Sequence, residues 1–129
     1  MALPNHLARA YRASRYQVAG LTLSIGRRSG ALDGLLAGLG VREAILITAW
    51  NPASRRMPRG WNTRMMAALR DRLGSTPALP ARGRGHDWSE DHFLVMGDKR
   101  RLAVLARLFG QSAMVACRRG QDVQLVPLV

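Results

Sequence analysis

The sequence has few cysteines, few aromatic residues and no long apolar run. Its single cysteine, Cys117, excludes an intrachain disulfide, lies in an apolar stretch and is expected to be a small core residue. A chain without disulfides fits a reducing compartment, so we expect a cytoplasmic protein. No apolar run approaches the ~18 residues of a membrane span, and the N-terminus lacks the order of a secretory signal. We therefore expect no membrane partner.

Acidic residues are also scarce, and the first of them is Asp33. Twenty basic residues against eight acidic ones give a net charge of +12 and a pI near 11.8. This balance favours a polyanionic partner such as RNA or DNA. However, 19 of the 20 basic residues are arginine, and they are scattered rather than gathered in one block, as expected from a GC-rich genome. A basic nucleic-acid-binding accessory protein without catalysis is therefore the alternative hypothesis.

The length of 129 residues predicts one domain, spanning residues 1–129, that is large enough to bury its own core. Helix and strand patterns follow one another along the chain. They predict an α/β (α+β) fold with a mixed central sheet of about five to six strands, flanked by about three helices.

The central strand is expected at residues 44–52. Ile45, Leu46 and Ile47 are apolar at consecutive positions, which predicts a strand covered on both faces. Pro52 ends this strand and a basic loop follows. The strand therefore delivers polar groups to its end, between two helix patterns.

The other elements follow from apolar spacing and from capping residues. A period-two pattern over residues 16–25 slips at Ala19 and Gly20, which indicates either a bulge or a tight turn. Residues 3–12 can form a short helix with Pro4 in its first turn. The three main helices are expected from Ser29 to Gly40, over 61–73 with the buried stripe Trp61, Met65, Leu69 and Leu73, and from Asp98 to Gly110. The remaining strands are expected at 93–96, 113–116 and 123–126, with an exposed edge strand or open loop over 79–87.

Short motifs in a fixed order link these elements. They are Thr48, Ala49, Asn51, Pro52 and Ser54 at the strand end, Asn62 in the next helix, Trp88 and Glu90 before an apolar strand, and Phe109, Gly110, Gln111 and Ala113 after the last helix. The set resembles an uncharacterised bacterial family catalogued as domain of unknown function 3293. The resemblance covers nearly the whole chain and implies no activity. The chain departs from the family pattern at Arg59, Gly60 and Trp61, where acidic residues are expected, and at His92, where a serine is expected.

Five polar residues sit where a strand or helix begins or ends, which is where such folds collect ligand-binding groups: Asn51, Ser54, Asn62, Glu90 and Gln111. We expect them to converge on one cleft. Each also has a local explanation, since Asn51 can make a turn, Asn62 can cap its helix and Gln111 can bind backbone.

The predicted ligand is a small anionic or nucleotide-like molecule. Its binding residues are expected to be Trp50, Asn51, Ser54, Arg55, Asn62, Glu90 and Gln111. Arg55, with Arg56 and Arg59 nearby, supplies positive charge for a phosphate. A second, weaker anion site is expected at Arg27, Arg28 and Ser29, in a glycine-bounded turn before a helix.

Few residues in the sequence point to catalysis. No serine sits in the glycine-flanked elbow of acyl-transfer enzymes. Glu90 beside Trp88 is the best acid or base, because partly apolar surroundings raise the pKa of a carboxyl group. The acidic and histidine residues around it lack a second cluster at metal spacing, so we expect neither a metal nor a cofactor. Whether the protein is an enzyme stays open.

Overall fold

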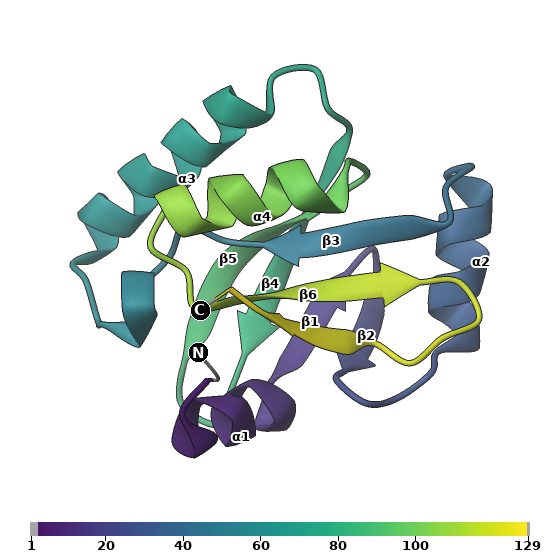
Figure 1. Cartoon of the computed structure of the whole chain (residues 1–129), viewed down its shortest axis with the longest axis horizontal. Coiled ribbons are helices and arrows are strands. Elements are labelled where there is room, and N and C mark those ends of the chain that lie inside the picture. The colour runs from purple at the N-terminus through teal and green to yellow at the C-terminus, as the bar shows by residue number, and fades with distance from the viewer. Residues whose placement is uncertain (1–2, 129) are drawn as a thin grey trace.

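A computed structural model describes residues 3–128 and shows an α+β fold built on one seven-stranded sheet (Figure 1). The strand order is β2-β1-β4-β5-β3-β6-β7, and the sheet curves into a half-barrel. The strands are β1 (Arg15–Val18), β2 (Leu21–Ser24), β3 (Glu43–Ile47), β4 (Ala78–Arg84), β5 (Ser89–Val95), β6 (Ala113–Arg118) and β7 (Gln124–Pro127). The helices are α1 (Asn5–Ala13), α2 (Gly30–Gly38), α3 (Arg59–Leu73) and α4 (Lys99–Leu108), with a short 3₁₀ turn η1 (Pro52–Ser54).

The predicted element count and sheet type were wrong. Within residues 3–128 the sheet has seven strands rather than five or six, and its pairs are antiparallel where a mixed sheet was expected. Four helices are present there rather than about three, and the fourth is α1, in the segment that the sequence allowed as a short helix. One cause is the period-two segment, which forms the hairpin β1–β2. Ala19 and Gly20 both have positive φ, at 50° and 78°, so the slip in the pattern is a tight turn.

The segment expected as an edge strand or loop is instead an inner strand. β4 pairs with β1 on one side and with β5 on the other. Pro80 lies opposite Phe93 of β5 but one residue beyond the β1 ladder, which runs from Arg84 to Ala81. The missing N–H of Pro80 therefore interrupts no pairing with β1, and the prediction from proline content failed.

Strand β3 lies in the middle of the sheet and is buried on both faces, as predicted. Ile45 and Ile47 point to the face covered by α3 and α4, and Ala44 and Leu46 point to the face covered by α2 (Figure 1). Cys117 is fully buried in the second of these cores, as expected. The double coverage confirms that the apolar run is a core strand.

The buried stripe of α3 differs from the predicted one. Leu69 and Leu73 are buried as expected, but Asn62 and Met66 precede them in place of Trp61 and Met65. A strict four-residue spacing drifts around a helix by roughly 40° at each step, because one turn takes 3.6 residues. The observed spacing alternates four and three residues, so the stripe stays on one face of α3. This places the side-chain amide of Asn62 at the sheet.

Helix ends follow the predicted capping residues. Ser29 accepts a hydrogen bond from the Leu32 amide at 3.1 Å, and Asp98 caps α4 in the same way. Gly40 and Gly110, both at φ 73°, end α2 and α4 in left-handed turns. None of the helices found within residues 3–128 is both long and apolar enough to cross a bilayer.

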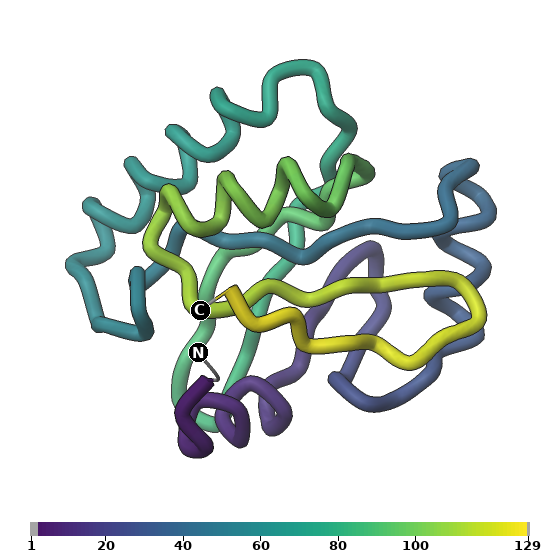
Figure 2. Tube along the Cα trace, viewed as in Figure 1, coloured from purple at the N-terminus to yellow at the C-terminus, as the bar shows by residue number. Residues whose placement is uncertain are grey.

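The antiparallel pairing gathers three connections at one end of the sheet. β3 ends beside the start of β5 and beside the start of β6, since Ile47 lies opposite Phe93 and Leu46 opposite Val115. Figure 2 shows the loop after β3 next to the segment that joins α4 to β6. Helix α1 lies on the same face of the sheet as α2, which we call the inner face, but at its other end, and it has no fully buried residue (Figure 1). The outer face is the one that carries α3 and α4.

Candidate functional site

The loop after β3 begins with a hydroxyl group that ties it to β5. Thr48 donates its hydroxyl to the Asp91 carbonyl at 2.6 Å and accepts the Trp50 amide at 3.0 Å. This contact continues the β3–β5 pairing beyond the ladder, which ends at Ile47. The position of Trp50 is therefore set by the sheet.

The junction between α4 and β6 holds the same loop from the other side. Gln111 donates its side-chain amide to the Trp50 carbonyl at 3.1 Å, and the Ala53 amide donates to the Gly110 carbonyl at 2.7 Å. A Cβ atom at Gly110 would lie 2.7 Å from Cβ of Pro52, so this position has no room for a side chain. Gly110 and Gln111, which follow α4, therefore have a structural role, because both hold the loop after β3.

Asn51 and Asn62 form a reciprocal pair. The Asn51 amide N–H donates to Oδ1 of Asn62 at 2.9 Å, and Nδ2 of Asn62 donates to Oδ1 of Asn51 at 2.8 Å. The Met57 amide also donates to Oδ1 of Asn51, at 2.9 Å. Asn51 has a left-handed backbone, φ 44° and ψ 68°, which asparagine tolerates better than most residues. Asn62 is only 2% exposed and does not cap α3, whose N-cap is Pro58.

The same pair holds Glu90. Nδ2 of Asn51 donates to Oε1 of Glu90 at 3.2 Å. Burial raises the pKa of this carboxyl group above its ordinary value, and the hydrogen bond from Asn51 opposes part of that rise. Every fully buried side-chain oxygen and nitrogen within residues 3–128 has a partner, and Oε1 is the only Glu90 oxygen bonded there, so Oε2 is accessible.

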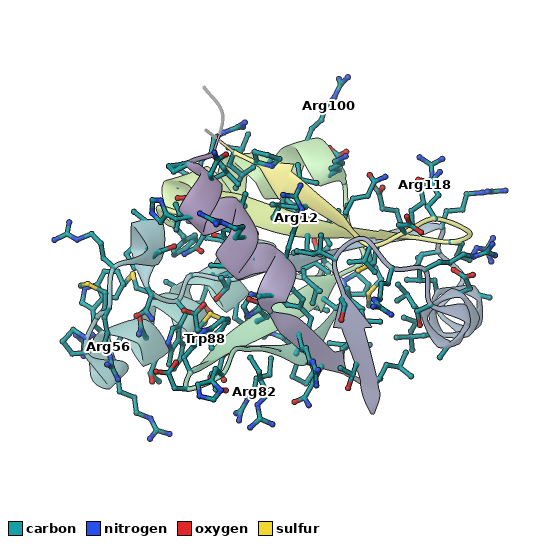
Figure 3. All side chains as sticks on the ribbon, turned by 90° about the horizontal axis from the view of Figure 1, so that it is seen from below. Arg12, Arg56, Arg82, Trp88, Arg100 and Arg118 are labelled. Atoms are coloured by element: carbon teal, nitrogen blue, oxygen red, sulfur yellow. The ribbon has the colours of Figure 1, made fainter. Side chains whose placement is uncertain are left out.

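These groups line a cavity of about 830 Å³ between α1 and the inner face of the sheet. Tyr11 of α1 lies over it, near Ser54 and Glu90. Burial raises the pKa of Tyr11, the Ser54 hydroxyl lowers it, and the Glu90 charge raises it again. Seen from the side of α1, the helix crosses in front of the strands (Figure 3). The Glu90 carboxyl group and the hydroxyl groups of Tyr11 and Ser54 thus lie close together in the cavity.

His92 lines the cavity but was not among the residues predicted to bind the ligand. Alternation along β5 places Glu90 and His92 on the inner face, whereas Asp91 points outward to Arg82 at 3.5 Å. Burial lowers the pKa of His92 to about 4, while the Glu90 carbonyl and Asp91 act in the opposite direction. The imidazole is therefore neutral at pH 7. Its spacing of two residues from Glu90 on a strand is the signal that could have identified it.

The structure brings most of the predicted binding residues together. Six of them line the cavity: Trp50, Asn51, Ser54, Asn62, Glu90 and Gln111. Arg55 is exposed outside the lining, and Arg56 and Arg59 line the cavity instead. Figure 3 shows Arg56 and Trp88 at one end of the molecule and Arg118 at the other. The binding roles of all these residues stay predictions.

The weaker anion site lies away from this cavity, before α2. Arg28 pairs with Asp33 at 3.3 Å, and the Ser29 hydroxyl oxygen is engaged by the Leu32 amide. The Gly26 amide donates to the Val123 carbonyl at 2.7 Å. Arg27 is exposed. Several groups that an anion would use therefore already have partners within the protein.

The protein is therefore an α+β protein with one sheet and a polar cavity that its N-terminal helix covers. Residues 47–114 match the model of a family described as protein of unknown function (DUF3293), and because this is more than half of the chain, the protein belongs to that family. The family drawn from the motifs is confirmed, over residues 47–114 rather than over nearly the whole chain. Comparisons with curated proteins and with solved structures found no match. The matched segment contains the loop after β3, Glu90 and Gln111, whereas α1 and Tyr11 precede it.

The Asn51 and Asn62 pair is expected to behave as one unit in stability measurements. Asn51→Gly and Asn62→Ala should each lower the free energy of unfolding by about 1–3 kcal/mol, because each leaves buried partners unsatisfied. Glycine is chosen at position 51 because it keeps the left-handed backbone without strain. The double variant should lose less than the sum, by about 1 kcal/mol or more. Urea unfolding measures all three, and strictly additive losses would contradict the reciprocal pairing.

The neutral state of His92 predicts that stability falls with acid. Its folded pKa of about 4 lies below the unfolded value near 6.5, so the unfolded chain binds a proton first as the pH falls. Stability is complete above about pH 6.5 and should drop by about 2 kcal/mol from pH 7 to pH 5. The raised pKa of Glu90 acts in the opposite direction, so the fall is measured as the difference between the wild type and His92→Gln. Equal pH dependence in both proteins would show that His92 protonates freely in the folded state.

Proposed function

We propose that the protein binds a small anionic or nucleotide-like ligand in the cavity between α1 and the sheet. The observation that carries this proposal is the convergence of Glu90, Tyr11 and Ser54 in one cavity with Arg56 and Arg59 among the arginines of its lining. Its volume of about 830 Å³ falls in the range of small-molecule sites. The cavity is also built on a rigid sheet, which favours the orientation of a small ligand.

The cavity lining carries three arginines, Arg56, Arg59 and Arg82, and three acidic residues, Asp87, Glu90 and Asp91, and the arginines that have no acidic partner can hold an anion. Arg56 and Arg59 are exposed and line its opening, where each guanidinium group can form two parallel hydrogen bonds to a phosphate. The net charge of +12 attracts anions from solution. Trp50 and Trp88 also line the cavity, and Trp88 is 40% exposed with its indole packed over Gly85. Trp50 packs against the apolar core under α3 and α4, so Trp88 supplies the surface on which a base can stack.

The predicted binding residues divide into two groups by the state of their polar atoms. Asn51, Asn62 and Gln111 use their side-chain amides in contacts within the protein, so they position the loop. Glu90 and Ser54, with Tyr11, are left to contact a ligand. This division favours Glu90 over Asn51 as the ligand contact. Binding is the proposed function, and no reaction is assigned to it.

A thermal-shift screen of nucleotides and phosphorylated metabolites, followed by calorimetry, tests this proposal. Glu90→Ala should weaken binding of the best ligand by about tenfold, the effect of removing one hydrogen bond. Arg56→Gln combined with Arg59→Gln should weaken it further and reduce its dependence on salt. The matched controls are Glu43→Ala, at the other end of β3, and Arg100→Gln with Arg118→Gln, on α4 and at the end of β6. Equal effects of site and control variants, or no binding by the wild type, would reject the proposal.

The nucleic-acid alternative is favoured by one observation on the outer face of the sheet. Arg15 of β1 lies directly opposite Arg84 of β4, and Gln17 lies opposite Arg82. Cross-strand partners share a face, so three exposed arginines are neighbours there. Like charges placed opposite each other are destabilising, and a phosphate backbone would relieve the repulsion.

If this face binds nucleic acid, affinity for a short single-stranded RNA or DNA should fall steeply with salt. Arg15→Gln combined with Arg84→Gln should weaken binding and reduce the salt slope by about two, one for each arginine that no longer neutralises a phosphate. Arg100→Gln combined with Arg118→Gln is the control with the same change in charge. Fluorescence anisotropy at several salt concentrations measures both, and no binding at low salt would exclude this alternative.

A further inference from the structure

The ring of His92 is fixed by three neighbours. It lies over Gly83 of β4, where a Cβ atom would be 2.8 Å from Cε1 of the imidazole. The Tyr16 ring meets it edge-on, with centroids 5.6 Å apart and planes at 74°. Nδ1 lies 3.1 Å from the Glu90 carbonyl oxygen. A residue without a side chain at position 83 therefore makes room for this ring, and its orientation is set by β1, β4 and β5.

The contact with the Glu90 carbonyl determines where the proton of the ring sits. A carbonyl oxygen only accepts hydrogen bonds, so Nδ1 must donate and carries the proton. In the neutral ring Nε2 then has a free lone pair and is an acceptor. Within residues 3–128 the Glu90 carbonyl is the only hydrogen-bond partner of the ring. His92 is only 8% exposed, but it lines the cavity, and because the fully buried side-chain nitrogens within residues 3–128 all have partners, Nε2 keeps some exposed surface.

Glu90 stands next to this acceptor. Residues two apart on a strand are about 7 Å from each other on the same face, so the Glu90 carboxyl and the His92 ring lie side by side. Both groups accept hydrogen bonds when the carboxyl is ionised. A ligand that contacts both must therefore bring hydroxyl or N–H donors, and the arginines at the opening suit a phosphate on the same ligand.

We propose that Nε2 of His92 accepts a hydrogen bond from a hydroxyl or N–H group of the ligand. This inference rests on the proposed function and narrows its ligand class. The cavity selects phosphate esters of sugars or nucleosides over phosphate esters that carry no donor.

Two probes and two variants test this selection. Ribose phosphate carries hydroxyl donors, whereas phenyl phosphate carries none apart from its phosphate group. His92→Asn keeps an amide N–H near the position of Nδ1, for the Glu90 carbonyl, but has no acceptor at the position of Nε2. His92→Gln reaches that position with an amide oxygen. His92→Asn should weaken binding of ribose phosphate by about tenfold and leave phenyl phosphate unchanged, and His92→Gln should retain ribose phosphate within about threefold of the wild type.

Calorimetry with both probes separates failure of the inference from failure of the proposed function. Unchanged ribose phosphate affinity in His92→Asn, or an equal loss for both probes, would overturn the inference and leave ligand binding in place. No binding of either probe by the wild type would overturn both. If the variants do not fold, nitrogen NMR of the wild-type imidazole replaces them. The expected result is an unprotonated Nε2 whose resonance moves on addition of ribose phosphate and not of phenyl phosphate, and a protonated Nε2 or an unmoved resonance would overturn the inference.

Discussion

The pairing of Asn51 with Asn62 is the interaction on which the site depends. The chain leaves β3 through a loop in which Asn51, Ala53 and Ser54 all have positive φ, at 44°, 53° and 59°. Such backbone costs of order 1–3 kcal/mol for each residue, so the surrounding contacts must hold it in place. The amide pair does so from α3, and Gly110 with Gln111 does so from the far side. The strained loop places Ser54 beside Tyr11 and aims Asn51 at Glu90.

The antiparallel sheet explains why residues far apart in sequence meet here. In this arrangement the end of β3 lies between the start of β5 and the start of β6. Glu90 therefore comes from the beginning of a strand and Asn51 from beyond the end of its neighbour. Helix α1 covers the inner face at this end, while α2 covers it at the other. The cavity is the part of the inner face that α2 does not fill.

The sequence was informative where one local signal decides the structure. Consecutive apolar residues at 45–47 identified the central strand, and Ser29, Asp98, Gly40 and Gly110 identified helix ends. It failed where pairing between distant segments decides. Nothing local to β4 shows that β1 covers its second edge, because Pro80 and the exposed arginines are typical of an edge. The positions of Tyr11 and His92 in the cavity depend on the same kind of long-range contact, and so neither was among the predicted binding residues.

The cavity between α1 and the sheet is the proposed binding site for a small anionic ligand. Mapping backbone amide chemical shifts during titration with ribose phosphate tests it most directly, since all three candidate surfaces are observed in one experiment. We expect the shifts to cluster at Tyr11, Ser54, Glu90 and His92, and the turn at Arg27 and Arg28 to stay unchanged. Shifts confined to that turn, or spread over Arg15, Arg82 and Arg84 on the outer face, would contradict it.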